Sequence, residues 1–112
     1  MELKSTLIRP LEHGIEIQCE VENLSLNIYF IMGETDFEAI TTLVPKERFE
    51  LGNDIHVASL DESQDIEDEM ESVLVNMQSE DTVIFFCSDE NSYHTGLDFL
   101  NYQDSRSFIK PN

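Results

Sequence analysis

The residues with the chemistry of a thiol protease are Cys87, His94 and Asp98, close together near the end of the chain. In such enzymes a histidine takes the thiol proton and a carboxylate orients the imidazole ring. Cys87, however, ends an apolar run over residues 83–87, where a cysteine is commonly a buried core residue. The spacing of the three residues matches no catalytic motif. The sequence therefore predicts a protein that is not an enzyme and has no catalytic residue.

Side chains that bind metals or phosphates form no recognisable pattern either. His13, His56 and His94 are far apart in the sequence, and none is paired with a cysteine at the spacing of a zinc site. The segment 61–66 lacks the glycine and the alternating ligands of a calcium-binding loop. The four glycines are scattered and form no phosphate-binding loop. We therefore expect neither a metal nor a cofactor.

Acidic side chains dominate the chemistry of the chain. Among 112 residues there are 24 aspartates and glutamates but only 6 lysines and arginines, which gives a net charge of −18. Residues 49–105 contain fifteen of the acids and no lysine or arginine. Such an imbalance destabilises the folded state through self-repulsion, so it indicates a purpose outside the fold. The simplest purpose is the recognition of a strongly basic partner.

Seven of these acids are concentrated in one short segment: Asp61, Glu62, Asp65, Glu67, Asp68, Glu69 and Glu71. The first three are expected in the first turn of a helix, where the helix dipole stabilises each by about 0.3–1 kcal/mol. From Asp65 onward these acids also form like-charged pairs three or four residues apart, and each pair costs about 0.2–0.5 kcal/mol. A charged helix face is often only a solvated face. Here the acidic bias extends over half the chain, which favours a partner.

The elements that position these side chains begin with strands. In residues 15–22 apolar residues alternate with polar and acidic ones, which predicts a strand with one buried and one acidic face. Residues 24–32 alternate in the same way, so the two segments are expected to pair as an antiparallel hairpin. An earlier strand is expected over residues 3–8. A short helix capped by Thr35 or Asp36 is expected to follow the hairpin, with a strand as the alternative.

The second half of the chain combines strands with a better-defined helix. A helical apolar stripe is formed by Ile66, Met70, Val73, Leu74 and Met77. Asp61 and Gln64 resemble a capping box at its start. Strands over residues 55–60 and 83–87 flank this helix, which predicts a βαβ unit. A connection is expected over residues 49–52, a last helix from near Ser92, and an edge strand over residues 107–109.

The chain is thus expected to form one α+β domain over residues 1–112, with a mixed β-sheet. The sheet combines an N-terminal antiparallel hairpin with a βαβ-like unit, and two or three helices lie on one side. The N-terminus lacks the basic and apolar stretches of a signal peptide. The longest apolar run is too short to span a membrane. We therefore expect a soluble cytoplasmic protein with two free thiols, Cys19 and Cys87.

The charge favours a bacterial inhibitor of the immunity or antitoxin type that binds and neutralises a basic partner, a toxin nuclease first among them. Carboxylates would pair with the lysines and arginines that hold phosphates. Nucleic acid and anionic membranes repel such a surface. The free protein is expected to be a monomer that forms a heterodimer. The alternatives are a nucleic-acid mimic that inhibits a host defence protein, of the anti-CRISPR or anti-restriction type, a non-catalytic acidic accessory subunit, and acidity that reflects a salty habitat.

The predicted partner-binding residues come from the exposed side of the acidic helix and from the segment after residues 83–87. The carboxyl end of a central strand is a common binding position. The set is Asp61, Glu62, Asp65, Asp68, Glu69, Asp89, Glu90, Tyr93, Asp98, Tyr102 and Asp104. The alternative for Tyr93 and Tyr102 is that they cover the edge of the core. A separate candidate is the strand face of Glu16, Glu20 and Glu22, which is more simply a solvated sheet face.

Overall fold

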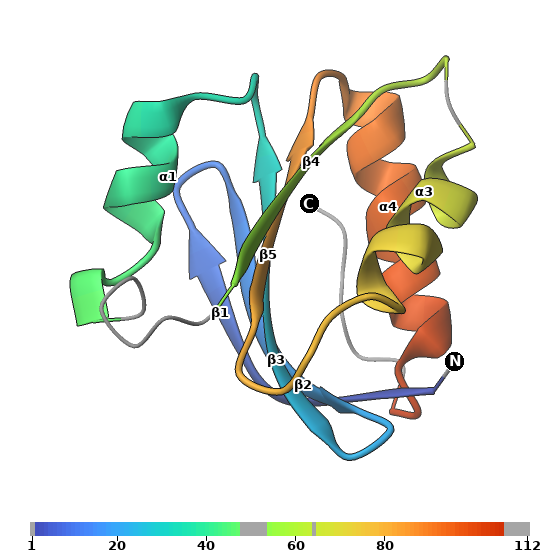
Figure 1. The fold of residues 1–112 in the computed structure, drawn as a ribbon. Coiled ribbons are helices and arrows are strands. Elements are labelled where there is room, and N and C mark those ends of the chain that lie inside the picture. The colour runs from blue at the N-terminus through green and yellow to red at the C-terminus, as the bar shows by residue number, and fades with distance from the viewer. Residues whose placement is uncertain (1, 48–53, 64, 107–112) are drawn as a thin grey trace.

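Five strands form one mixed sheet in the computed structural model, which describes residues 2–47, 54–63 and 65–106 (Figure 1). In the order of the sheet the strands are β1 (Leu3–Leu11), β2 (Gly14–Val21), β3 (Leu24–Met32), β5 (Thr82–Cys87) and β4 (Ile55–Leu60). The first three are antiparallel, whereas β5 runs parallel to both β3 and β4. The helices are α1 (Phe37–Leu43), α3 (Ile66–Leu74) and α4 (Glu90–Gln103). This arrangement confirms the predicted single α+β domain, with its hairpin and its βαβ unit.

The hairpin between β2 and β3 turns at Glu22 and Asn23, whose φ angles are 50° and 70°. Two central residues with positive φ give a turn whose twist matches that of the flanking strands. The first strand extends further than expected, to Leu11, and includes Pro10. Proline is tolerated there because β1 lies at the edge of the sheet, where its missing N–H breaks no ladder.

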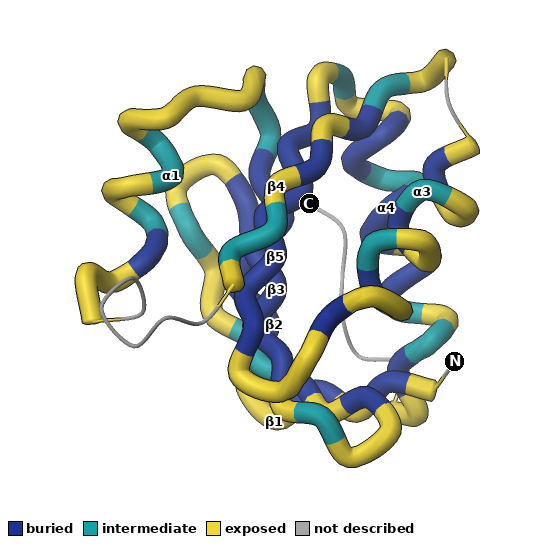
Figure 2. The backbone as a smooth tube through the Cα atoms, in the orientation of Figure 1, coloured by how far each residue is buried: buried dark blue, intermediate teal, exposed yellow. Residues whose placement is uncertain are grey.

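Helices cover both faces of the sheet, so the expectation that they lie on one side is wrong. α3 and α4 pack on the face that carries Ile28, Phe30 and Phe85. α1 contributes to a smaller cluster on the opposite face, with Tyr29 and Ile84 (Figure 1). The six residues of β5 are all buried, and an interior parallel strand needs apolar cover on both sides. Figure 2 shows the central strands in dark blue, whereas α1 is exposed or half-buried along its length.

α3 begins later than the sequence predicts. Its N-cap is Asp65, whose side chain accepts a hydrogen bond from the amide of Asp68 at 3.2 Å. Asp61 instead accepts the amide of Ser63 at 2.9 Å in a turn before the helix. The expectation that Asp61 and Glu62 occupy the first helical turn is therefore wrong, and Gln64 lies outside the described residues. Asp61 and Asp65 are both good capping residues, so residue type alone does not separate the predicted start from the observed one.

The predicted stripe of α3 is confirmed for Ile66, Met70 and Leu74, which are buried, whereas Val73 is half-buried. Met77 is buried too, but it lies beyond the end of the helix, which stops earlier than predicted. The last helix is also confirmed, and it begins at Glu90 with Asp89 as its N-cap. Gly96 lies on its inner face, where an added Cβ would collide with the ring of Phe30. The segments 49–52 and 107–109, predicted to be a connection and an edge strand, lie outside the described residues.

Candidate functional site

A groove of about 500 Å³ lies between α3 and α4, which pack side by side (Figure 1). Four carboxylates line it, three from α3 and one from α4. The lining residues are Glu67, Asp68, Glu71, Asp98, Phe99, Tyr102 and Gln103. No lysine, arginine or histidine is among them. The groove therefore has the character of a cation-binding surface with an aromatic side.

The burial of the two helices explains why these side chains point outward. In α3 the apolar stripe faces the sheet, which leaves Glu67, Asp68 and Glu71 exposed. In α4 the inner face carries buried leucines, and Asp98 and Tyr102 lie one turn apart on the outside. The ring of Tyr102 is 85% exposed, so it is an unusually large unburied aromatic surface.

A second apolar side chain extends this surface beyond the groove. Val75, just after α3, is 65% exposed and borders a shallow depression with Asp68, Glu71 and Ser72. Interfaces need apolar or aromatic anchors as well as charges, since charges at the rim seldom dominate affinity. Tyr102 and Val75 supply such anchors next to the carboxylates.

The charges of this surface are not compensated by basic side chains within the described part of the chain. The ion pairs there join Arg9 to Glu16 on the sheet, His13 to Glu12 in the turn between β1 and β2, and His56 of β4 to Asp81 just before β5. None involves an acid of α3 or α4 in the described ranges. The negative potential of the groove is therefore directed to the solvent.

A second acidic group lies at the carboxyl ends of β4 and β5, away from the groove. Asp61 and Glu62 follow β4, and Asp89 and Glu90 follow β5. The carboxylate of Asp89 accepts the amide of Ser92 at 2.7 Å, as a helix cap. Hydrogen bonds, that of the Ser92 amide foremost, hold the pKa of Asp89 below its ordinary value. Asp89 and Glu90 follow a central strand as expected, whereas Asp61 and Glu62 were expected in the helix, and Asp89 is occupied as a cap.

Two of the predicted binding residues are buried, so the expectation that they are exposed is wrong. Tyr93 is 5% exposed and packs its ring 5.2 Å from that of Phe30, which confirms the alternative that it covers the core. Asp104 is 2% exposed and accepts hydrogen bonds from the hydroxyl and amide of Ser5. It also accepts the amide of Arg106 at 2.7 Å. Asp104 therefore joins the end of α4 to β1.

The thiol of Cys87 is unsuited to nucleophilic chemistry. Its side chain is buried, and burial, with a smaller effect of the Asp89 charge, raises the pKa of Cys87 to about 12. A nucleophilic cysteine needs a thiolate, which a raised pKa disfavours. Cys19 is also buried and free, and its pKa is likewise raised to about 12.

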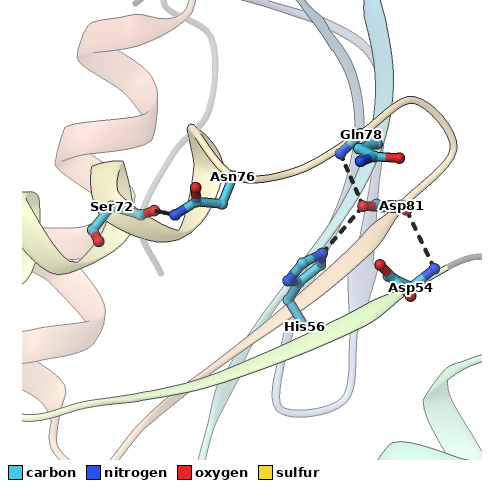
Figure 3. Close-up of polar contacts among 6 residues, drawn as sticks. All are labelled: Asp54, His56, Ser72, Asn76, Gln78 and Asp81. Carbon is cyan, nitrogen blue, oxygen red and sulfur yellow. Dashed lines mark hydrogen bonds and ion pairs between the residues drawn. The ribbon is translucent and has the colours of Figure 1, made fainter.

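Asp54, His56 and Asp81 form a cluster that the sequence does not reveal (Figure 3). Their possible ligand atoms lie within 4.8 Å of one another. The Asp81 carboxylate already accepts N–H groups from Gln78 at 2.8 Å, His56 at 3.1 Å and Asp54 at 3.3 Å. Burial raises the pKa of Asp81, but these hydrogen bonds outweigh it and the pKa lies below its ordinary value.

These hydrogen bonds hold the loop that precedes β5 in place, which explains why the three side chains lie together. Its members are distant in the sequence, and only the pairing of Ile55 with Thr82 brings them together. Figure 3 also shows the side-chain amide of Asn76 bound to the carbonyl of Ser72, close to the same loop.

Of the predicted binding residues, the groove brings together Asp68, Asp98 and Tyr102. Glu67 and Glu71 also line the groove but were not in the predicted set, although the sequence places both opposite the apolar stripe. The chain matches no protein-family model, no curated protein and no solved structure. In the described residues, no helix has the length and apolar character needed to cross a membrane.

Proposed function

We propose that this protein is an inhibitor that binds a strongly basic partner protein, a toxin nuclease ahead of other targets, through the groove between α3 and α4. The observation that supports this is the combination of four exposed carboxylates with the exposed ring of Tyr102. Carboxylates make charge-assisted hydrogen bonds with the lysines and arginines of a phosphate-binding site. The bound inhibitor would then exclude the nucleic acid from that site.

The two kinds of side chain have different tasks in this proposal. The net charge of −18 accelerates the encounter with a basic protein, which matters when an inhibitor competes with damage to the cell. Tyr102 and Val75 supply the desolvated contact that slows dissociation. The buried free thiols of Cys19 and Cys87 are compatible with a reducing compartment, and we propose the cytoplasm.

The test begins with a partner captured from a lysate of the source cell and identified, whose nuclease activity is then titrated with the purified protein. A variant that we call groove-neutral combines Glu67→Gln, Asp68→Asn and Glu71→Gln. These substitutions remove the three α3 charges of the groove and leave Asp98 in place. We expect the association rate of this variant to fall by about tenfold at low salt. The matched control combines Glu34→Gln, Glu38→Gln and Glu47→Gln, exposed residues in and around α1. This control also removes three negative charges, but far from the groove, so its association rate should fall much less.

An uncharged substitution separates the groove from general electrostatics. Tyr102→Ala should weaken the complex by about tenfold or more, because aromatic anchors at the centre of an interface dominate affinity. Phe37→Ala is the control, since Phe37 is 78% exposed on α1. Equal losses in the groove and control variants, or a captured nuclease that stays active at saturating inhibitor, would contradict the proposal.

A further inference from the structure

β4 lies at one edge of the sheet and pairs only with β5 among the described strands. The carbonyls of Asp54 and Leu60 accept the amides of Thr82 and Ser88, each at 3.1 Å. In a parallel ladder, alternate residues direct both backbone groups to the same side. Asp54, His56, Ala58 and Leu60 therefore face β5. The N–H and C=O groups of the intervening residues, Ile55, Val57 and Ser59, point away from the sheet.

The opposite edge of the sheet, β1, is protected against pairing with a further strand, so its features can be compared with those of β4. In β1 the register shifts between Ser5 and Leu7, and Pro10 removes a donor. The end of α4 also covers β1, because the amide of Ser105 donates to the carbonyl of Leu3 at 2.9 Å. Bulges, prolines and covering segments are the usual ways to prevent edge pairing. The six residues of β4 contain no proline, lysine, arginine, aspartate or glutamate, and its pairing with β5 has no bulge.

The side chains of β4 suit a strand partner. Val57 is 41% exposed, with an apolar β-branched side chain that favours cross-strand packing. Ser59 is exposed on the same face, and its hydroxyl contacts that of Thr35. The hydroxyl contact of Ser59 involves only side chains, so it leaves the backbone N–H and C=O groups that point away from β5 unused. The edge therefore offers both hydrogen bonds and an apolar contact.

The flanking charges determine which strand fits. Asp54 precedes β4, and Asp61 and Glu62 follow it. If β4 paired antiparallel along its whole length with β4 of a second copy, Asp54 would lie opposite Asp61 at both ends. Like charges directly opposite are destabilising, whereas opposite charges are favourable. An extended segment with lysine or arginine at its ends fits this edge, and a second copy does not.

We propose that the edge of β4, which pairs with no described strand other than β5, accepts an extended segment of the basic partner as a sixth strand of the sheet. The inference rests on the proposed function and adds a binding mode to it. Main-chain hydrogen bonds supply affinity in such strand addition, and side chains supply specificity. Because α3 packs against β4, one partner can contact both the edge and the acidic helix.

The test uses a short synthetic peptide of alternating valine and threonine with arginines at both ends. We expect it to slow hydrogen exchange at the amides of Ile55, Val57 and Ser59. Val57→Pro removes an outward N–H but no bond to β5, a position where edge strands tolerate proline. Affinity for the peptide should fall by about tenfold. Val57→Thr keeps the N–H and the β-branch, so it should bind within about twofold of the original.

A second measurement leaves the protein unchanged, in case Val57→Pro does not fold. The same peptide, N-methylated at alternate residues, cannot donate to the edge and should lose binding. Unaltered binding of the methylated peptide, or dimerisation of the free protein through β4, would overturn the inference. If Val57→Pro retains the captured partner while the groove-neutral variant loses it, strand addition fails and the proposed function stands. If the captured partner still binds both variants at full affinity, the groove fails as its binding site as well.

Discussion

Among the described residues three carboxylates are buried, and they act inside the fold. Glu16 pairs with Arg9 across β1 and β2, Asp81 anchors the loop before β5, and Asp104 joins α4 to β1. A buried charge is tolerated only with hydrogen bonds or an opposite charge. Most of the other acids in the described ranges are exposed, and the proposed binding surface is built from some of them.

Removing the charge of Asp104 should destabilise the protein. Asp104→Asn weakens the hydrogen bonds from Ser5 and Arg106, so the free energy of unfolding at pH 7 should fall by about 1–3 kcal/mol. The matched control is Asp98→Asn, which removes one exposed charge and should change stability by less than about 0.5 kcal/mol. Urea denaturation followed by circular dichroism measures both. Equal stability of the two variants would contradict the structural role of Asp104.

The same carboxylate makes stability depend on pH. Burial raises the pKa of Asp104, but hydrogen bonds from Ser5 and Arg106 outweigh it and hold the pKa below the ordinary 3.8. A lowered pKa in the folded state means that the stabilisation is complete above the ordinary value. It is lost as the pH falls from there through the folded pKa. Wild type should therefore lose more stability below this pH than Asp104→Asn does.

At the scale of elements, α4 can approach β3 closely because Gly96 has no side chain. In Gly96→Ala the new methyl group would meet the ring of Phe30, which is fully buried and cannot move freely. Overpacking of a core costs about 1–3 kcal/mol, more than the gain in helix propensity. The neighbouring Thr95→Ala is the control, since it raises helix propensity without this contact. A more stable Gly96→Ala protein, measured by thermal unfolding, would show that the contact relaxes.

The elements and their pairing in the hairpin and the βαβ unit were largely predictable, whereas the packing of the helices was not. Alternation identified the hairpin, and the stripe of Ile66, Met70 and Leu74 identified α3, because these periods follow directly from burial on one face. The start of α3 was predicted too early, at Asp61, because Asp61 is as good a capping residue as the observed cap Asp65. The groove depends on how α3 and α4 pack, and the cluster around Asp81 depends on the register of β4 and β5. Neither is encoded in local sequence.

At the scale of the whole molecule, the net charge of −18 has opposite effects on folding and on binding. Exposed carboxylates repel one another within the folded chain but attract a basic partner. Salt screens both interactions, because the Debye length falls from about 30 Å at 0.01 M to about 10 Å at 0.1 M. Stability and association rate, measured over the same range of salt, therefore test both effects.

We expect the urea midpoint of the isolated protein to rise between about 0.01 M and 0.2 M sodium chloride, because screening relieves self-repulsion. Over the same range the association rate with the captured partner should fall, while the dissociation rate changes little. The protein should already be folded at the lowest salt, since its sheet is buried on both faces. An adaptation to a salty habitat has the opposite signature, because such a protein needs concentrated salt to fold. Unfolding at low salt together with an unchanged association rate would therefore assign the acidity to habitat rather than to a partner.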